Sequence, residues 1–171
     1  ARAWNGPPEV QRGRKGRTEH GPGIYLTTSY ATAAKYAKGG GTVKRVSVDT
    51  NLGWLDDVRI PLADTIAFVR DTPRMRKKAE IIADLKRNAD RLGVGVVGAY
   101  VLRNLAVNYD ALVGDVAPAM AAFFVRHGAD ADVVETSSEG AQEDWLVLFN
   151  PAKIVSIDVV DKRASSDARH L

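Results

Sequence analysis

Segments with the pattern of β-strands lie at both ends of this chain, and segments with the pattern of helices lie between them. Near the amino terminus, residues 23–27 and 42–50 are typical of strands, and the second alternates apolar and polar side chains. Near the carboxyl terminus, three apolar stretches at 131–135, 145–150 and 153–160 are also typical of strands. Strands and helices do not alternate regularly and no segment repeats, so a doubly wound parallel sheet is not expected. This order predicts an α+β fold.

The middle of the chain, from about residue 55 to residue 122, is predicted to be helical. Thr72-Pro73 is predicted to begin one of its helices, because proline favours the first helical turn. Two more helical segments are expected at 94–107 and around 117–127. A chain of 171 residues is long enough to bury a core, so residues 1–171 are expected to form a single domain with these helices as an insertion.

The composition excludes several classes of site. The chain has no cysteine, so neither a disulfide framework nor a thiolate metal site is possible. Its three histidines, His20, His127 and His170, are far apart and lack metal-site spacing, and no metal is expected. No apolar run approaches the length of a membrane span, and the start of the sequence has no signal-peptide pattern. We therefore expect a cytoplasmic protein without a membrane partner.

The small net charge of +3 is unevenly distributed. One cluster of basic residues lies within 12–17 and contains Arg14 and Arg17, and another lies within 70–78. Such clusters can bind phosphates, and they can equally form an ordinary solvated surface. Charge alone does not identify a nucleic-acid-binding protein.

Residues 21–38, GPGIYLTTSYATAAKYAK, contain three of the five tyrosines in the chain. Tyr25 lies on a predicted strand, whereas Tyr30 and Tyr36 lie on a predicted helix that residues 28–29 can cap. The G-x-G of this segment lacks the remainder of a dinucleotide-binding pattern. A strand followed by a helix can bring Tyr25 and Tyr36 to one cleft, where they can stack on a flat ligand. Packing in the core is the alternative, and Tyr30 is assigned to packing.

Two other short motifs place polar groups beside predicted strands. In WNGP, Gly6 allows a ligand to approach the backbone and Asn5 can hydrogen-bond to it, although Asn-Gly is also a common turn. In EGAQEDWLVLFNP, Glu143 and Asp144 immediately precede an apolar strand. These carboxylates can project into a cleft or belong to a solvated acidic loop.

These three motifs, in this order, resemble the motif segments of the ADP-ribosyltransferase superfamily, in the branch of poly(ADP-ribose) polymerases and diphtheria toxin. Trp4-Asn5-Gly6 resembles an aromatic-His-Gly strand end, with asparagine in place of histidine. GIYLT, with Tyr36 eleven residues after Tyr25, resembles the second segment. DWLVLFNPAKI resembles the third segment as it occurs in phage-encoded and toxin-like members. The resemblance covers about residues 1–50 and 123–160 and leaves the helical middle unassigned.

The third segment departs from the commonest form of the family at one position. Trp145 stands where most members have the catalytic glutamate. Asp144 matches the acid of the variant pattern, and Glu143 precedes it directly. Because side chains alternate between the faces of a strand, only one of these two carboxylates is expected to point into the cleft.

The resemblance implies a split antiparallel sheet and a reaction with NAD⁺ as substrate, without a metal. Tyr25 and Tyr36 would stack on nicotinamide, the Gly6 backbone would bind its carboxamide, and Asn5 would bind the adenosine-side ribose. Asp144 or Glu143 would stabilise positive charge on the nicotinamide-side ribose. A basic residue of the amino-terminal loop, Arg14 or Arg17, would contact the pyrophosphate. His20, in the same loop, could border the cleft, although a solvent-exposed position is expected.

The function that the resemblance implies is mono-ADP-ribosylation of a macromolecule by a toxin, an anti-phage protein or a phage effector. The acceptor is expected to be a protein or a nucleic acid, and a neutralising antitoxin is a further expected partner. Two alternatives stay open. One is an NAD⁺ glycohydrolase of the same fold, and the other is a binding module in which Trp145 replaces the catalytic acid.

Overall fold

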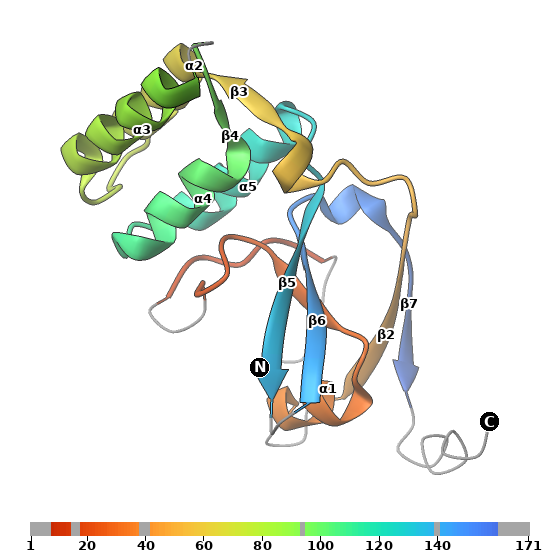
Figure 1. Cartoon of the computed structure of the whole chain (residues 1–171). Helices are drawn as coiled ribbons and strands as arrows, with labels where there is room; N and C mark the ends of the chain where they lie inside the picture. Colours follow the sequence, from red (N-terminus) through yellow and green to blue (C-terminus); the bar gives the residue numbers. More distant parts are fainter. Residues whose placement is uncertain (1–7, 15–17, 38–41, 93–94, 139–140, 161–171) are drawn as a thin grey trace.

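The computed structural model describes residues 8–14, 18–37, 42–92, 95–138 and 141–160 (Figure 1). Its strands and helices follow one another along the chain as β1 (Ile24–Thr27), α1 (Tyr30–Tyr36), β2 (Val43–Val48), η1 (Leu55–Asp57), β3 (Arg59–Pro61), α2 (Leu62–Asp71), α3 (Lys78–Leu92), β4 (Val96–Gly98), α4 (Ala99–Asn108), α5 (Val116–Arg126), β5 (Ala131–Ser138), β6 (Ala141–Leu148), η2 (Pro151–Lys153) and β7 (Ile154–Val160).

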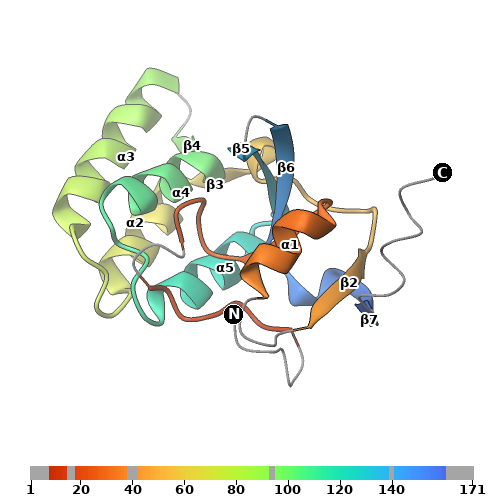
Figure 2. The ribbon, with the colours of Figure 1, turned by 90° about the horizontal axis from the view of Figure 1, so that it is seen from below.

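Strands from the two ends of the chain pair with each other. β6 lies between β1 and β5 in an antiparallel three-stranded sheet, and β2 pairs with β7 in an antiparallel sheet of two strands. The short strands β3 and β4 form a third pair among the helices. Helices α2 to α5 gather on one side of the molecule, and α1 crosses the far end of the three-stranded sheet (Figures 1 and 2). The α+β architecture expected from the sequence is confirmed.

The three-stranded sheet has an apolar layer on each face. On one face, the buried Val147 and the half-buried Tyr25 and Val134 pack against the large core formed by the helices. On the other face, Ile24 and Leu148 form a smaller cluster with residues of β2 and β7. Side chains alternate along each strand, so successive residues of β1 and β6 face different surroundings. This alternation decides which side chains of the acidic segment can meet the tyrosines.

Helix α1 begins where the sequence predicts. Ser29 is its N-cap residue, and the Ser29 hydroxyl accepts a hydrogen bond from the Thr32 N–H at 3.2 Å. Such a cap satisfies one of the free N–H groups at a helix start, which typically contributes about 1 kcal/mol. The cap therefore fixes the turn that carries the chain from β1 into α1.

The prediction that Thr72-Pro73 begins a helix is wrong. Helix α2 ends at Asp71, and α3 begins only at Lys78. Between them Arg74 and Lys77 have φ angles of 61° and 57°, in the left-handed region that a right-handed helix excludes. The expectation of helix from residue 94 is also wrong, since β4 precedes α4.

Candidate active site

Glu143 and Trp145 lie on the same face of β6, and Asp144 lies on the opposite face. The pairing of β1 with β6 places Thr27 opposite Trp145 and Tyr25 opposite Val147. Directly opposed residues share a face in an antiparallel sheet. Glu143, Trp145, Tyr25 and Thr27 therefore belong to the face that continues into the helical core.

Trp145 is the centre of an aromatic cluster. Its ring centroid lies 6.1 Å from that of Tyr25, 5.7 Å from that of Tyr36 and 6.0 Å from that of His20. All three rings meet the indole edge to face, an arrangement favoured by the quadrupoles of aromatic rings. The two tyrosines of the second motif thus approach a common centre, and Trp145 occupies that centre.

Two features of this cluster, an unpaired indole N–H and an exposed tyrosine, distinguish it from an ordinary core. The indole Nε1 of Trp145 is buried and has no hydrogen-bond partner. Tyr36 at the outer side keeps 59% of its surface exposed, so the cluster opens to solvent there. A buried N–H without a partner costs free energy, and a ligand acceptor or a small shift of the indole would relieve that cost.

The Tyr25 hydroxyl connects the cluster to the loop before β1. It donates a hydrogen bond to the Gly21 carbonyl at 2.6 Å and accepts one from the His20 N–H at 3.3 Å. Burial raises the pKa of Tyr25 to about 12, and the hydrogen bond from His20 partly opposes that rise. The hydroxyl is therefore protonated at neutral pH and holds the loop, which keeps the His20 ring against Trp145.

Glu143 is held by two hydroxyl groups from the strand and helix of the tyrosine motif. Thr27 on β1 donates a hydrogen bond to Oε1 of Glu143, and Thr32 on α1 donates one to Oε2 at 2.8 Å. The Thr27 hydroxyl also accepts a hydrogen bond from the Ser29 N–H at 3.0 Å. The carboxylate is therefore fixed in orientation beside the aromatic cluster while remaining only half-buried.

Asp144 has different surroundings. It is exposed, and its direct partner across the β5–β6 pair is Glu135, another exposed carboxylate. Of the two acids predicted from the sequence, the structure places Glu143 on the sheet face of Tyr25 and bonds it to the helix that carries Tyr36, whereas Asp144 lies on the opposite face. The sequence pattern left this choice open, because it gave no register for the strand.

An ion pair lies beneath the loop that carries His20. Arg103 on α4 contacts Asp132 on β5 at 2.6 Å, and only 18% and 5% of their side-chain surfaces are exposed. Burial raises the pKa of Asp132, and the neighbouring guanidinium partly offsets that effect. A Cβ added to Gly21 would lie 2.8 Å from Cγ of Arg103, so the loop packs directly on the arginine.

Among the remaining predicted site residues, only Arg14 lies in the part of the chain that the structure describes, and it is not part of this cluster. Arg14 lies in a separate hollow beside α4. Asn5, Gly6 and Arg17 lie outside the described residues. Conversely, sequence reasoning assigned no role to Thr27 or Thr32. Both threonines belong to the tyrosine motif in sequence. The pairing of β1 with β6 brings Thr27 to Glu143, and the position of α1 after β1 brings Thr32 there.

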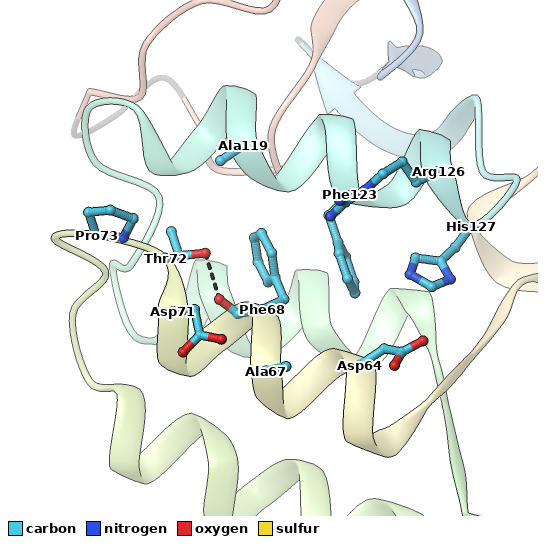
Figure 3. Close-up of a pocket in the computed structure, with 10 residues that line it drawn as sticks. All are labelled: Asp64, Ala67, Phe68, Asp71, Thr72, Pro73, Ala119, Phe123, Arg126 and His127. Atoms are coloured by element: carbon cyan, nitrogen blue, oxygen red, sulfur yellow. Dashed lines mark hydrogen bonds between the residues drawn. The ribbon is translucent and has the colours of Figure 1, made fainter.

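Another hollow, of about 600 Å³, lies between α2 and α5 (Figure 3). Phe68 and Phe123 stack in it with their ring centroids 4.4 Å apart, and none of the predicted site residues that the structure describes lines it. Of its two lining aspartates, Asp71 is paired with Arg70 at 2.6 Å. The stacked rings are accounted for by the packing of α2 on α5, so we place the candidate site at Glu143 and Trp145.

Among the described residues, no group of three His, Asp or Glu side chains is arranged to hold a metal ion. In the same part of the chain, no helix combines the length and apolar character needed to cross a membrane. No protein-family model, curated protein or solved structure matches this sequence.

Proposed function

We propose that the protein is a mono-ADP-ribosyltransferase that moves ADP-ribose from NAD⁺ to a macromolecular acceptor. The observation that carries the proposal is the position of Glu143, fixed by Thr27 and Thr32 on the same sheet face as Tyr25 and Trp145. A split antiparallel sheet, which the resemblance to the superfamily implies, is supported by the separate β1–β6–β5 and β2–β7 sheets.

The reaction breaks the bond between the ribose C1′ and the nicotinamide nitrogen. The bonding electron pair leaves with neutral nicotinamide, and positive charge develops on the ribose as it does in glycoside cleavage. A fixed carboxylate stabilises that charge without having to reorient. One preorganised group of this kind can increase the reaction rate by a factor of about 100 or more. The acceptor then bonds to C1′ and releases a proton to solvent. Glu143 is the residue to which we assign the electrostatic role.

The aromatic cluster is suited to a flat cationic ring. Nicotinamide in NAD⁺ carries a positive charge, which aromatic faces attract by cation–π interaction. Tyr36 is exposed and Tyr25 is anchored through its hydroxyl, so a ring entering from the Tyr36 side would first meet Tyr36 and Trp145. Stacking directly between Tyr25 and Tyr36 requires the indole of Trp145 to move aside.

The position of Trp145 also favours the alternative of a binding module without catalytic activity. The indole already makes edge-to-face contacts with both tyrosines, which stabilises a closed cluster. A module of this kind would bind a nucleotide and release no nicotinamide. An NAD⁺ glycohydrolase, with water as acceptor, would release nicotinamide and label no macromolecule.

The test compares two neutral substitutions at adjacent residues. Wild type, Glu143→Gln and Asp144→Asn are incubated with NAD⁺ labelled in its adenine half and a cell lysate, and both nicotinamide release and macromolecular label are measured. We expect Glu143→Gln to lower nicotinamide release by about a hundredfold and Asp144→Asn to leave it within about twofold. Equal activity in all three proteins excludes Glu143 from the mechanism, and a wild type that releases no nicotinamide refutes the proposal.

A further inference from the structure

A second hollow, of about 220 Å³, brings together the two basic clusters of the sequence. Arg14 comes from the loop before β1, and Arg76 comes from the connection between α2 and α3. The floor between them is formed by the end of α4 and the chain that follows it, including Val107 and Val113. Figures 1 and 2 show this amino-terminal loop running alongside α4 and α5.

Arg14 is placed by the residues immediately before it. Gly13 and Gly114 exchange two backbone hydrogen bonds of 2.8 and 2.9 Å, and the Arg12 side chain pairs with Asp115 at 2.7 Å. A Cβ on Gly13 would lie 1.6 Å from the Leu112 carbonyl oxygen, so only glycine allows this approach. The loop is therefore tied to the start of α5 at the residue that precedes Arg14.

Arg76 is placed by a buried neighbour and an unusual backbone. Met75 is only 5% exposed and anchors the α2–α3 connection in the helical core. Arg74 and Lys77 on either side have positive φ angles, a conformation that costs about 1 kcal/mol or more for a residue other than glycine. A connection anchored in this way presents Arg76 at the surface of the hollow.

Neighbouring charges in the second basic cluster are already used within the protein. Arg70 pairs with Asp71, Lys77 pairs with Glu80, and Lys78 donates to the Arg70 carbonyl at 2.7 Å. Within the described ranges, Arg14 and Arg76 form no ion pair, and both are exposed. They are therefore available to a ligand from outside the protein.

We propose that this hollow binds one nucleotide of a single-stranded nucleic acid. Two guanidinium groups suit a phosphate, because their N–H groups match its oxygens in pairs. The apolar floor suits a sugar or a base. Glu19 and Asp110 also line the hollow and disfavour a ligand with two adjacent anions. These two carboxylates can accept hydrogen bonds from groups next to the phosphate. The sugar hydroxyls and base amino groups of a nucleotide are donors of this kind.

The hollow lies next to the candidate active site. Glu19 lines the hollow, and the next residue, His20, contacts Trp145 in the aromatic cluster. A strand held at Arg14 and Arg76 would thus lie close to the aromatic cluster, whose Trp145 shares a sheet face with Glu143. This proposal rests on the proposed function and deepens it, because it makes a single-stranded nucleic acid the acceptor of ADP-ribose.

Fluorescence anisotropy of a short fluorescein-labelled oligoadenylate, as RNA and as DNA and without NAD⁺, tests the site. Arg14→Gln and Arg76→Gln are compared with wild type and with Arg45→Gln, a control on β2 whose exposed arginine pairs with Asp158. We expect each test variant to weaken binding about tenfold and the control to match wild type. The slope of log affinity against log salt should fall by about 0.7 in each test variant.

Several results would overturn this assignment. They are absence of oligonucleotide binding by wild type, equal weakening in all three variants, or unchanged binding in Arg14→Gln and Arg76→Gln. Calorimetric titration with NAD⁺ adds another: if these two variants lose affinity for NAD⁺ and keep the oligonucleotide, the hollow serves the NAD⁺ pyrophosphate. Unchanged urea midpoints show that the variants are folded. Oligonucleotide binding without nicotinamide release would instead refute the transferase and leave the phosphate site standing.

Discussion

The Thr32 hydroxyl on α1 donates a hydrogen bond to Oε2 of Glu143 on β6 at 2.8 Å, across 111 residues of sequence. This bond joins the helix of the tyrosine motif to the acidic strand. Thr32 is 6% exposed, so water does not replace the bond when it is removed. The contact therefore ties the orientation of the carboxylate to the same element that positions Tyr36.

Replacing Thr32 by valine keeps the shape of the side chain and removes the hydroxyl. If Glu143 acts as proposed, we expect kcat for nicotinamide release to fall about tenfold with little change in KM, since the carboxylate loses a hydrogen bond that fixes it. Thr32→Ser, which retains a hydroxyl, should restore most of the rate. Steady-state kinetics of nicotinamide release measure both parameters.

Thr28→Val is the matched control for that experiment, because Thr28 is exposed in the turn between β1 and α1. Its kinetics should equal those of wild type. A Thr32→Val protein with wild-type kcat would show that the hydrogen bond does not position a catalytic group. A rise in KM alone would assign Thr32 to substrate binding.

Asp144 and Glu135 are expected to destabilise the fold slightly. They are direct partners on β6 and β5, and like charges in such a pair repel each other. Asp144→Asn should therefore raise the free energy of unfolding by about 0.2–1 kcal/mol, with the smaller values at high salt. Urea denaturation at low and high ionic strength measures this. A loss of stability in Asp144→Asn would contradict the expected repulsion.

The sequence predicted those parts of the site that depend on local patterns. The strand with Tyr25 and the capped helix with Tyr36 have the expected secondary structure, whereas the acidic strand begins at Ala141, before the expected start at residue 145, and so includes Glu143. Strand alternation also predicted correctly that Glu143 and Asp144 face opposite sides. Which of the two faces the tyrosines depends on the register between β1 and β6, and a single sequence does not contain that register.

Other features depended on tertiary packing that overrides local preference. Thr72-Pro73 favours a helix start, but burial of Met75 holds the chain in an irregular connection as far as Lys78. Likewise, Arg14 and Arg76 are 62 positions apart, and they line one hollow because Gly13 pairs with Gly114 and Arg12 with Asp115. Neither arrangement has a signal in the periodicity of the sequence.

Tyr25 should make stability depend on pH in the alkaline range. Its pKa is raised from 10.0 to about 12 by burial, so between these values the unfolded chain loses the phenolic proton and the folded protein retains it. Stability from this group is complete below pH 10 and falls as pH rises toward 12. Tyr25→Phe should lack this component of the alkaline loss.

At neutral pH the same substitution should cost about 1 kcal/mol, because the hydrogen bond to the Gly21 carbonyl is lost. Urea denaturation of Tyr25→Phe and wild type across the alkaline range separates the two effects. Tyr30→Phe serves as the control, since Tyr30 lies on α1 outside the aromatic cluster. Identical alkaline profiles for wild type and Tyr25→Phe would show that Tyr25 does not titrate as expected.

Removing Arg103 should destabilise the protein through the acid that it leaves behind. In Arg103→Met, Asp132 stays buried on β5 without its partner, and loss of one member of a buried ion pair typically costs about 3–5 kcal/mol.

The pKa of Asp132 is already raised by burial, and removing the guanidinium raises it further. The unfolded chain has an ordinary aspartate pKa of 3.8. At pH values between this pKa and the raised pKa of the folded variant, the folded variant holds a proton that the unfolded chain has lost. Stability from this protonation is complete below that pKa and falls as pH rises. The free energy of unfolding of Arg103→Met should therefore fall short of the wild-type value by less near about pH 4 than at neutral pH. Urea denaturation at both pH values measures this difference. The double variant Arg103→Met/Asp132→Asn, which carries no buried charge, should lose this difference. A deficit that is the same at both pH values in the single variant would mean that lost packing beneath Gly21, and not the unpaired carboxylate, sets the cost.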